Sequence, residues 1–315
     1  MQGNVKKSVM AIPSIVHAAA TAIRDELSID RTDLKPVEPD RLIPARLTII
    51  PLIVVIVACG LGDGIIEAVR YFLTYTPDTA SSSVVIGLDD ELDYAFTVVP
   101  PIIFGILACI AMRLLRLPAP NCPHRRISVR TGVLAFFVAL IPLVLNNWLL
   151  QFAITVLHFR FFTGTPLSLL SPFAEGTMMV AYAAAGLEEE PIALGLVAVG
   201  LRRCKVSWPA IAAVAVLLRL SYHLYYGPAI VSWALWPLLY VMLYRRIGSI
   251  VPMILAHGVN DLAIALDTWW QSHMVIAHLS DRVVPAMAWV GVAIVVVVIV
   301  RRTVLGMRAV RAAKA

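Results

Sequence analysis

The sequence predicts an all-α protein: a polytopic transmembrane helix bundle with about eight spans and both termini in the cytoplasm. Hydrophobic residues make up 60% of the 315 residues and charged residues 15%, and the mean hydropathy is +0.83. Apolar runs long enough to cross a bilayer recur along the chain, which is more apolar surface than one soluble core can bury. Basic residues also gather in every second loop, a distribution typical of membrane proteins.

Three spans are predicted in the first half of the chain. Leu47 to Phe72 is a long apolar run in which Gly60-Leu61-Gly62 marks a point where a helix can bend. Phe96 to Leu115 follows an acidic loop and ends among arginines, and Thr131 to Leu157 begins directly after the next basic loop. Each contains the ~20 apolar residues that a membrane crossing needs.

Five spans follow, and several of them carry ionisable residues at membrane depth. The fourth contains three consecutive glutamates, the fifth and seventh carry histidines, the sixth ends at Arg245-Arg246, and the eighth precedes a basic tail. Their predicted bounds are Met178 to Leu201, Pro209 to Tyr226, Ile230 to Tyr244, Ile250 to Leu266 and Val283 to Val300.

The basic loops determine the expected orientation. Lys and Arg concentrate in the N-terminal segment, in residues 113–130, 202–205 and 245–246, and in the tail from Arg301, whereas residues 74–94 have none. The positive-inside rule therefore places both termini in the cytoplasm. The net charge of +6 lies in short loops beside the spans, so we expect anionic membrane lipid as a partner and no nucleic acid.

This organisation divides the chain into three parts. Residues 1–46 are expected to form a cytoplasmic N-terminal extension, residues 47–300 a transmembrane domain and residues 301–315 a basic cytoplasmic tail. The first apolar span begins near residue 47, so we expect no cleavable signal peptide. The predicted location is the cell membrane, as a multi-pass protein.

The polar residues at membrane depth are the candidates for chemistry. Glu188-Glu189-Glu190 lies inside an apolar stretch, where each ionised carboxylate costs roughly 2.5–3.5 kcal/mol. Arg219 and His223 are four residues apart, as are His257 and Asp261, so each pair is expected on one helix face. At about 1.5 Å per residue these positions reach a similar depth, and we expect a single cavity lined by glutamate, histidine and aspartate.

Three segments resemble motifs of the CAAX protease and bacteriocin-processing (CPBP, or Abi) family of intramembrane proteases, in particular its type II CAAX prenyl endopeptidases. Residues 189–195 resemble the motif EExxxRG, residues 219–223 stand where the family has FxxxH, and residues 257–261, after a basic turn, resemble HxxxN/D. The resemblance covers roughly residues 178–266, the expected catalytic core.

Two positions depart from these motifs. Leu194 replaces the arginine of the first motif, and Arg219 replaces the aromatic residue of the second. We hypothesise that Arg219 supplies the missing cation by pairing with Glu190, because a buried carboxylate without a partner tends to protonate. The motif pair is taken as Glu189 and Glu190, which aligns Gly195 with the family's glycine; the alternative frame uses Glu188 and Glu189.

The resemblance implies an intramembrane endopeptidase that hydrolyses a peptide bond of a membrane-associated peptide or protein. Catalysis is then expected from Glu189 and Glu190, with Glu189 as general base and His223 sharing its proton. His257 and Asp261 are assigned to the oxyanion. Because an ionised aspartate cannot donate, either Asp261 is protonated or it orients His257 while Asn260 or His257 donates.

Other interpretations of the same residues stay open. Glu189, His223, His257 and Asp261 are also a candidate ligand set for a divalent metal such as zinc, although no HExxH is present and the glutamate mechanism does not require a metal. A transporter would also place ionisable residues on broken helices. A catalytically inactive scaffold or immunity protein of the same fold is a third possibility. The tryptophans at 233, 236, 269 and 270 are interpreted as interfacial anchors.

Overall fold

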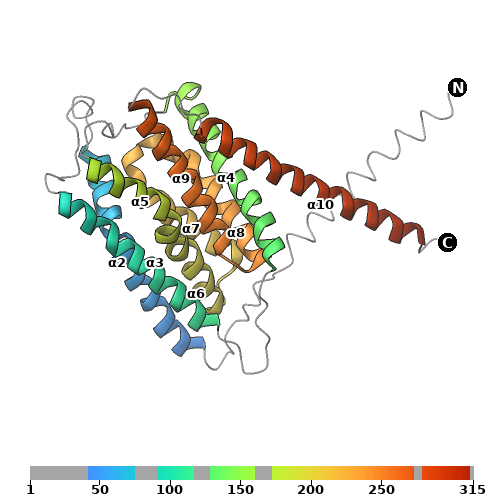
Figure 1. The fold of residues 1–315 in the computed structure, drawn as a ribbon. Helices are drawn as coiled ribbons and strands as arrows, with labels where there is room; N and C mark the ends of the chain where they lie inside the picture. The colour runs from blue at the N-terminus through green and yellow to red at the C-terminus, as the bar shows by residue number, and fades with distance from the viewer. Residues whose placement is uncertain (1–41, 75–90, 117–127, 160–171, 273–278, 313–315) are drawn as a thin grey trace.

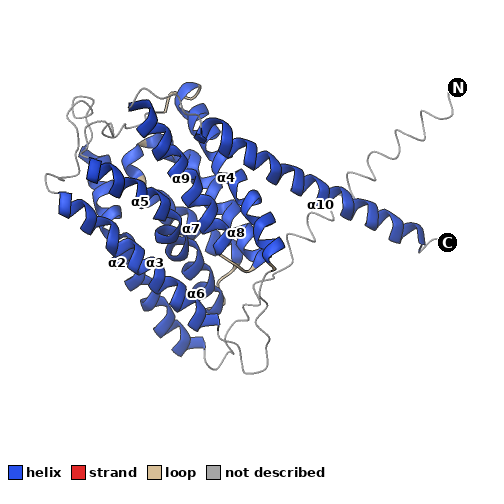
Figure 2. Cartoon of the chain, in the orientation of Figure 1, coloured by secondary structure: helices blue, strands red, loops and turns tan. Residues whose placement is uncertain are grey.

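The computed structural model describes residues 42–74, 91–116, 128–159, 172–272 and 279–312. Within these ranges the regular elements are helices and no strand is present (Figure 2), which confirms the all-α class. Residues 1–41, most of the predicted N-terminal extension, lie outside the described residues, as does the end of the tail.

Among the described residues, three helical segments are long and apolar enough to cross a membrane. They lie in α2 (Leu42–Thr74), in α4 (Val129–Thr155), and in η6 (Leu279–Val283) continued by α10 (Val284–Ala312). They correspond to the first, third and eighth predicted spans. The second half of α10 extends away from the other helices (Figure 1). The total of eight spans and the orientation of the termini remain predictions.

The remaining helices are shorter or interrupted. The elements are α3 (Glu91–Arg116), α5 (Pro172–Glu189), η3 (Glu190–Leu196), α6 (Val197–Arg203), α7 (Trp208–Ser221), η4 (Leu224–Tyr226), η5 (Pro228–Ala234), α8 (Leu235–Ile247) and α9 (Val251–Ser272).

The predicted fifth and sixth spans are not regular helices over their whole length. Helix α7 ends at Ser221, and the chain continues through the two short 3₁₀ segments η4 and η5 before α8 begins. Gly227, with φ of 80°, adopts a backbone conformation open mainly to glycine. Pro228 follows it and has no N–H to donate to a continuing helix. These two residues account for the break between η4 and η5, whereas α7 already ends at Ser221.

The predicted fourth span is helical throughout but contains a π-helical turn, η3, that starts at Glu190. Pro191 is the second residue of this turn. A proline inside a helix removes the hydrogen bond to the residue four positions earlier, and local widening of the helix accommodates that loss. Such π segments occur frequently at functional sites, and Glu190 is the first residue of this one.

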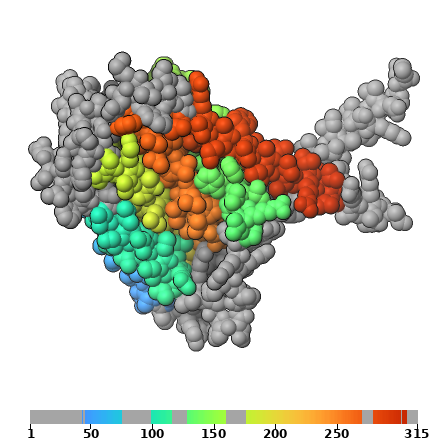
Figure 3. All heavy atoms as spheres, viewed as in Figure 1, coloured from blue at the N-terminus to red at the C-terminus, as the bar shows by residue number. Residues whose placement is uncertain are grey.

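Glycines allow the helices around this segment to approach backbone to backbone. A Cβ atom added at Gly105 of α3 would collide with the carbonyl oxygen of Leu187 in α5. A Cβ atom on Gly258 of α9 would collide with the carbonyl oxygen of Ala183 in α5. Small residues at such crossings are typical of membrane helix packing. As a result α5 lies between α3 and α9, as the neighbouring stripes in Figure 3 show.

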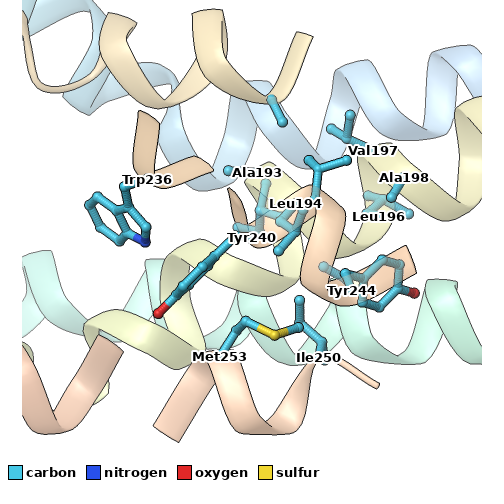
Figure 4. Packing of buried hydrophobic residues seen from close by; sticks show 14 of the residues in the cluster. Ala193, Leu194, Leu196, Val197, Ala198, Trp236, Tyr240, Tyr244, Ile250 and Met253 are labelled. Atoms are coloured by element: carbon cyan, nitrogen blue, oxygen red, sulfur yellow. The ribbon is translucent and has the colours of Figure 1, made fainter. Parts of the chain in front are cut away.

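The apolar core surrounds η3 and α6. Figure 4 shows Tyr240 and Tyr244 of α8 close to Leu194 and Leu196, and Met253 of α9 belongs to the same cluster of buried residues. Leu194 is therefore packed among apolar side chains. The apolar core therefore encloses position 194, where the first CPBP motif has an arginine.

Candidate active site

Arg219 lies near the end of α7 and joins the two motif glutamates. Its Nη1 donates to Oε2 of Glu189, and its Nη2 donates to Oε1 of Glu190 at 2.5 Å. The Arg219 side chain is only 2% exposed. The expected contact between Arg219 and Glu190 is confirmed, and Arg219 also contacts Glu189, a pair that was not predicted from the sequence.

His257, on α9, lies between two carboxylates. Its Nδ1 is 2.9 Å from Oε1 of Glu190 and its Nε2 is 3.1 Å from Oδ2 of Asp261. Asn260 donates from Nδ2 to Oδ1 of Asp261 at 2.9 Å. The expectation that His257 and Asp261 share one helix face is therefore confirmed. An imidazolium, which donates from both nitrogens, matches this arrangement.

These contacts form one continuous network, from Glu189 through Arg219, Glu190 and His257 to Asp261. It links α5 and η3 to α7 and α9. The two ends of the network are its most exposed carboxylates: the side chain of Glu189 is 17% exposed and that of Asp261 is 22% exposed, whereas Glu190 is fully buried.

Trp236 of α8 packs against this network, and its interpretation as an interfacial anchor was wrong. The Arg219 guanidinium carbon lies 4.3 Å from the centroid of the Trp236 ring. The ring also makes an edge contact with His257 at a centroid distance of 4.7 Å. Trp236 is buried because α8 turns this residue towards α7 and α9. It stabilises the cation and the imidazole together.

The other proposed anchors do not form one group. Trp233 is half-buried and its ring lies 4.9 Å from that of His223, so it too packs beside the site. Trp269 is half-buried, and the side chain of Trp270 lies outside the described residues.

His223 lies in the turn after α7, so the prediction that it shares a helix face with Arg219 was wrong. Its Nδ1 is 3.0 Å from the backbone oxygen of Arg219. A carbonyl oxygen only accepts, so Nδ1 carries the proton, and in the neutral ring Nε2 holds the lone pair. The ring of His223 lies 4.4 Å, between centroids, from the ring of Tyr222, whose hydroxyl contacts Glu189. His223 therefore lies beside the network.

Tyr222 and Glu188 also lie at the site; Tyr222 was not a candidate from the sequence, and Glu188 was a member of the alternative motif pair only. Tyr222 donates from its hydroxyl to Oε2 of Glu189 at 2.8 Å. Glu188, the residue before Glu189, has a buried Oε1 without a hydrogen-bond partner. Tyr222 could have been found from its position directly before His223. Glu188 was left out because Glu189 and Glu190 were taken as the glutamate pair of the first motif.

The candidate metal ligands do not fit a metal site. In the described ranges, no group of three or more His, Cys, Asp and Glu residues is arranged to hold a metal ion. Both nitrogens of His257 face carboxylates, and Nδ1 of His223 donates to a carbonyl oxygen. The His257 imidazole therefore has no nitrogen directed at a metal ion, and we assign no chemical step to a metal.

Fold and site together define an all-helical membrane protein with a buried network of carboxylates, arginine and imidazole. Residues 170–263, less than a third of the chain, match the model of the family described as type II CAAX prenyl endopeptidase Rce1-like. This match confirms the resemblance to the CPBP family, and it supports a protease of the CAAX type that acts on a peptide or protein at the membrane. No curated protein and no solved structure matches the chain.

The matched segment includes every residue described above as part of the site. It begins just before α5 and ends two residues after Asp261, so it contains the glutamates, Arg219, both histidines and Trp236. Helices α2, α3, α4 and α10 lie outside it.

Proposed function

We propose that this protein is an intramembrane endopeptidase that hydrolyses a peptide bond of a membrane-associated substrate with water activated by a glutamate. The observation that carries the proposal is the network from Glu189 to Asp261, which joins three helical segments within the part that matches the protease family. Ionisable groups at membrane depth are costly, and their usual role is functional.

Glu189 is the proposed general base. It is the more exposed of the two motif glutamates, so a water molecule can reach it, whereas Glu190 is fully buried. In the reaction Glu189 takes one proton from water while the water oxygen bonds to the substrate carbonyl carbon. His223, whose Nε2 holds a lone pair, is the second group proposed to accept this proton, relayed from Glu189.

Glu190 and Arg219 hold the site together. Arg219 bridges two carboxylates that would otherwise repel each other, and Glu190 receives both Arg219 and His257 on one oxygen, Oε1. We assign Glu190 a positioning role: it holds the imidazole of His257 from one side while Asp261 holds it from the other.

The amide of Asn260 is the proposed donor to the oxyanion from the third motif. The contact of Asp261 with Nε2 of His257 favours the alternative in which Asp261 orients His257. Both nitrogens of His257 face carboxylate oxygens, whereas Asn260 uses one of its two N–H groups on Asp261.

When the tetrahedral intermediate collapses, the C–N bond breaks and the amine nitrogen takes the proton held by Glu189.

The test compares the wild type with Glu189→Gln, Glu188→Gln and His257→Ala, expressed in membranes. Mass spectrometry would identify the peptide ends released from endogenous and supplied membrane substrates. Glutamine keeps the shape of glutamate but cannot act as the base, so we expect no new ends with Glu189→Gln and retained cleavage with Glu188→Gln.

The outcomes separate the alternatives. If Glu188→Gln loses cleavage and Glu189→Gln keeps it, Glu188 is the general base and the motif pair is Glu188 and Glu189. Identical ends in the wild type and all three well-folded variants would instead favour an inactive scaffold or a transporter.

A further inference from the structure

We propose that the hydroxyl of Tyr222 is a second donor to the oxyanion and that protonation of Glu189 releases it for this purpose. The inference rests on the proposed function, because it concerns the same reaction. It begins with a shortage of donors in the third motif: Nδ1 and Nε2 of His257 each face a carboxylate oxygen, at 2.9 and 3.1 Å. The third motif then offers the oxyanion one amide N–H, from Asn260.

Tyr222 is placed to make up this shortage. Its hydroxyl lies 2.8 Å from Oε2 of Glu189, the oxygen that also receives Arg219. Tyr222 is a buried residue, and its ring packs against His223 at 4.4 Å between centroids. The Arg219 guanidinium carbon is 5.6 Å from the ring centroid. The hydroxyl is therefore held directly beside the proposed base.

The proposed coupling follows from hydrogen-bond chemistry. An ionised Glu189 accepts the Tyr222 hydrogen bond strongly, because hydrogen bonds to charged groups are about twice as strong as neutral ones. Once Glu189 has taken the proton from water, the negative charge has moved to the substrate carbonyl oxygen. The Tyr222 hydroxyl then turns from the neutral carboxyl group to the oxyanion, which is the stronger acceptor.

The bonds and charges balance through this step. The water oxygen forms the new bond to carbon, the carbonyl π pair moves to oxygen, and Glu189 holds the proton. When the C–N bond breaks, its electron pair goes to nitrogen, which takes that proton from Glu189. Tyr222 keeps its own proton throughout and returns to the ionised Glu189.

The experiment uses Tyr222→Phe, which keeps the ring and its contacts with Arg219 and His223 and removes the hydroxyl. Removal of one oxyanion donor lowers kcat by about 10²–10³-fold in other hydrolases, and we expect a loss of that order with little change in KM. Tyr244→Phe is the matched control, because Tyr244 is also a buried tyrosine but belongs to the apolar core around η3 and α6.

A second measurement separates an oxyanion donor from a residue that only positions Glu189. A phosphinic peptide with the sequence of the cleaved substrate imitates the tetrahedral intermediate and carries its charged oxygens. If Tyr222 donates to the oxyanion, Tyr222→Phe should weaken binding of this inhibitor by about the same factor as it lowers kcat. Unchanged inhibitor affinity, or unchanged kcat, would overturn the inference.

The same experiment distinguishes failure of the inference from failure of the proposed function. If the wild type cleaves and Glu189→Gln does not, the endopeptidase assignment stands whatever Tyr222→Phe does. If the wild type releases no peptide ends, the proposed function fails first. Thermal unfolding of each variant in lipid nanodiscs would show that Tyr222→Phe is folded.

Discussion

Arg219 is the residue whose replacement tests the architecture of the site most directly. In the structure it compensates two carboxylates at once, Glu189 and Glu190, and its side chain is almost completely buried. Removing one partner of a buried ion pair costs about 3–5 kcal/mol, because an uncompensated charge remains in the interior. Since two carboxylates lose their partner here, we expect Arg219→Leu to reach the upper part of that range.

The assay is the free energy of unfolding of the purified protein in detergent micelles, measured together with cleavage activity. Arg219→Lys should lose less stability than Arg219→Leu, because one ammonium retains the charge but lacks the two-pronged geometry that reaches both glutamates. Arg70→Leu is the control: Arg70 pairs with Glu67 at 3.7 Å on an exposed part of α2, and such pairs contribute about 0–1 kcal/mol.

A double replacement tests whether the cation has moved from one motif to another. Arg219→Phe combined with Leu194→Arg recreates the pattern of the CPBP motifs at both positions. Leu194 is buried among apolar side chains, so Leu194→Arg alone should destabilise the protein. The double variant should recover part of the activity that Arg219→Phe loses.

The role of Arg219 as the partner of both glutamates would be refuted if Arg219→Leu kept wild-type stability and full activity.

Three further predictions concern the surroundings of the site. Gly258→Ala should destabilise the protein by about 1–3 kcal/mol, because its Cβ would collide with a backbone oxygen of α5. Gly306→Ala is the control in thermal unfolding and should not destabilise the protein, because no atom lies near an added Cβ there. Trp236→Leu should lower the free energy of unfolding by about 1 kcal/mol more than Trp236→Phe, because leucine has no ring face for Arg219; equal losses in denaturant titrations would contradict this. Asp267 accepts the backbone N–H groups of Leu279 and Ser280, so Asp267→Ala should cost about 0.5–2 kcal/mol and speed proteolysis between α9 and α10; unchanged proteolysis would argue against this connection.

Several features of the site could be predicted from residue spacing. His257 and Asp261 lie one helical turn apart, so any regular helix brings them together. The pair of Arg219 and Glu190 was also predictable, because the loss of an arginine at position 194 and the gain of one at position 219 conserve the charge near a glutamate that needs a partner.

The course of the chain after α7 was harder to predict. Hydropathy continues through residues 209–226, and periodicity does not show where a helix gives way to a 3₁₀ turn. Gly227-Pro228 was a signal for the end of the segment but not for the break at Ser221. The direction of the His223 ring therefore followed from the turn and not from a helix face.

The sequence by itself determined that this protein is an all-helical membrane protein, which segment resembles a protease family, and that His257 and Asp261 share a turn of helix. These properties depend on composition and on local periodicity. The tertiary structure decided that Arg219 bridges both glutamates, that Trp236 is buried against Arg219 and His257, and that His257 lies between Glu190 and Asp261. Such contacts join residues far apart in the chain, and they depend on how closely glycines and a π-helical turn let the helices approach, which no local pattern records.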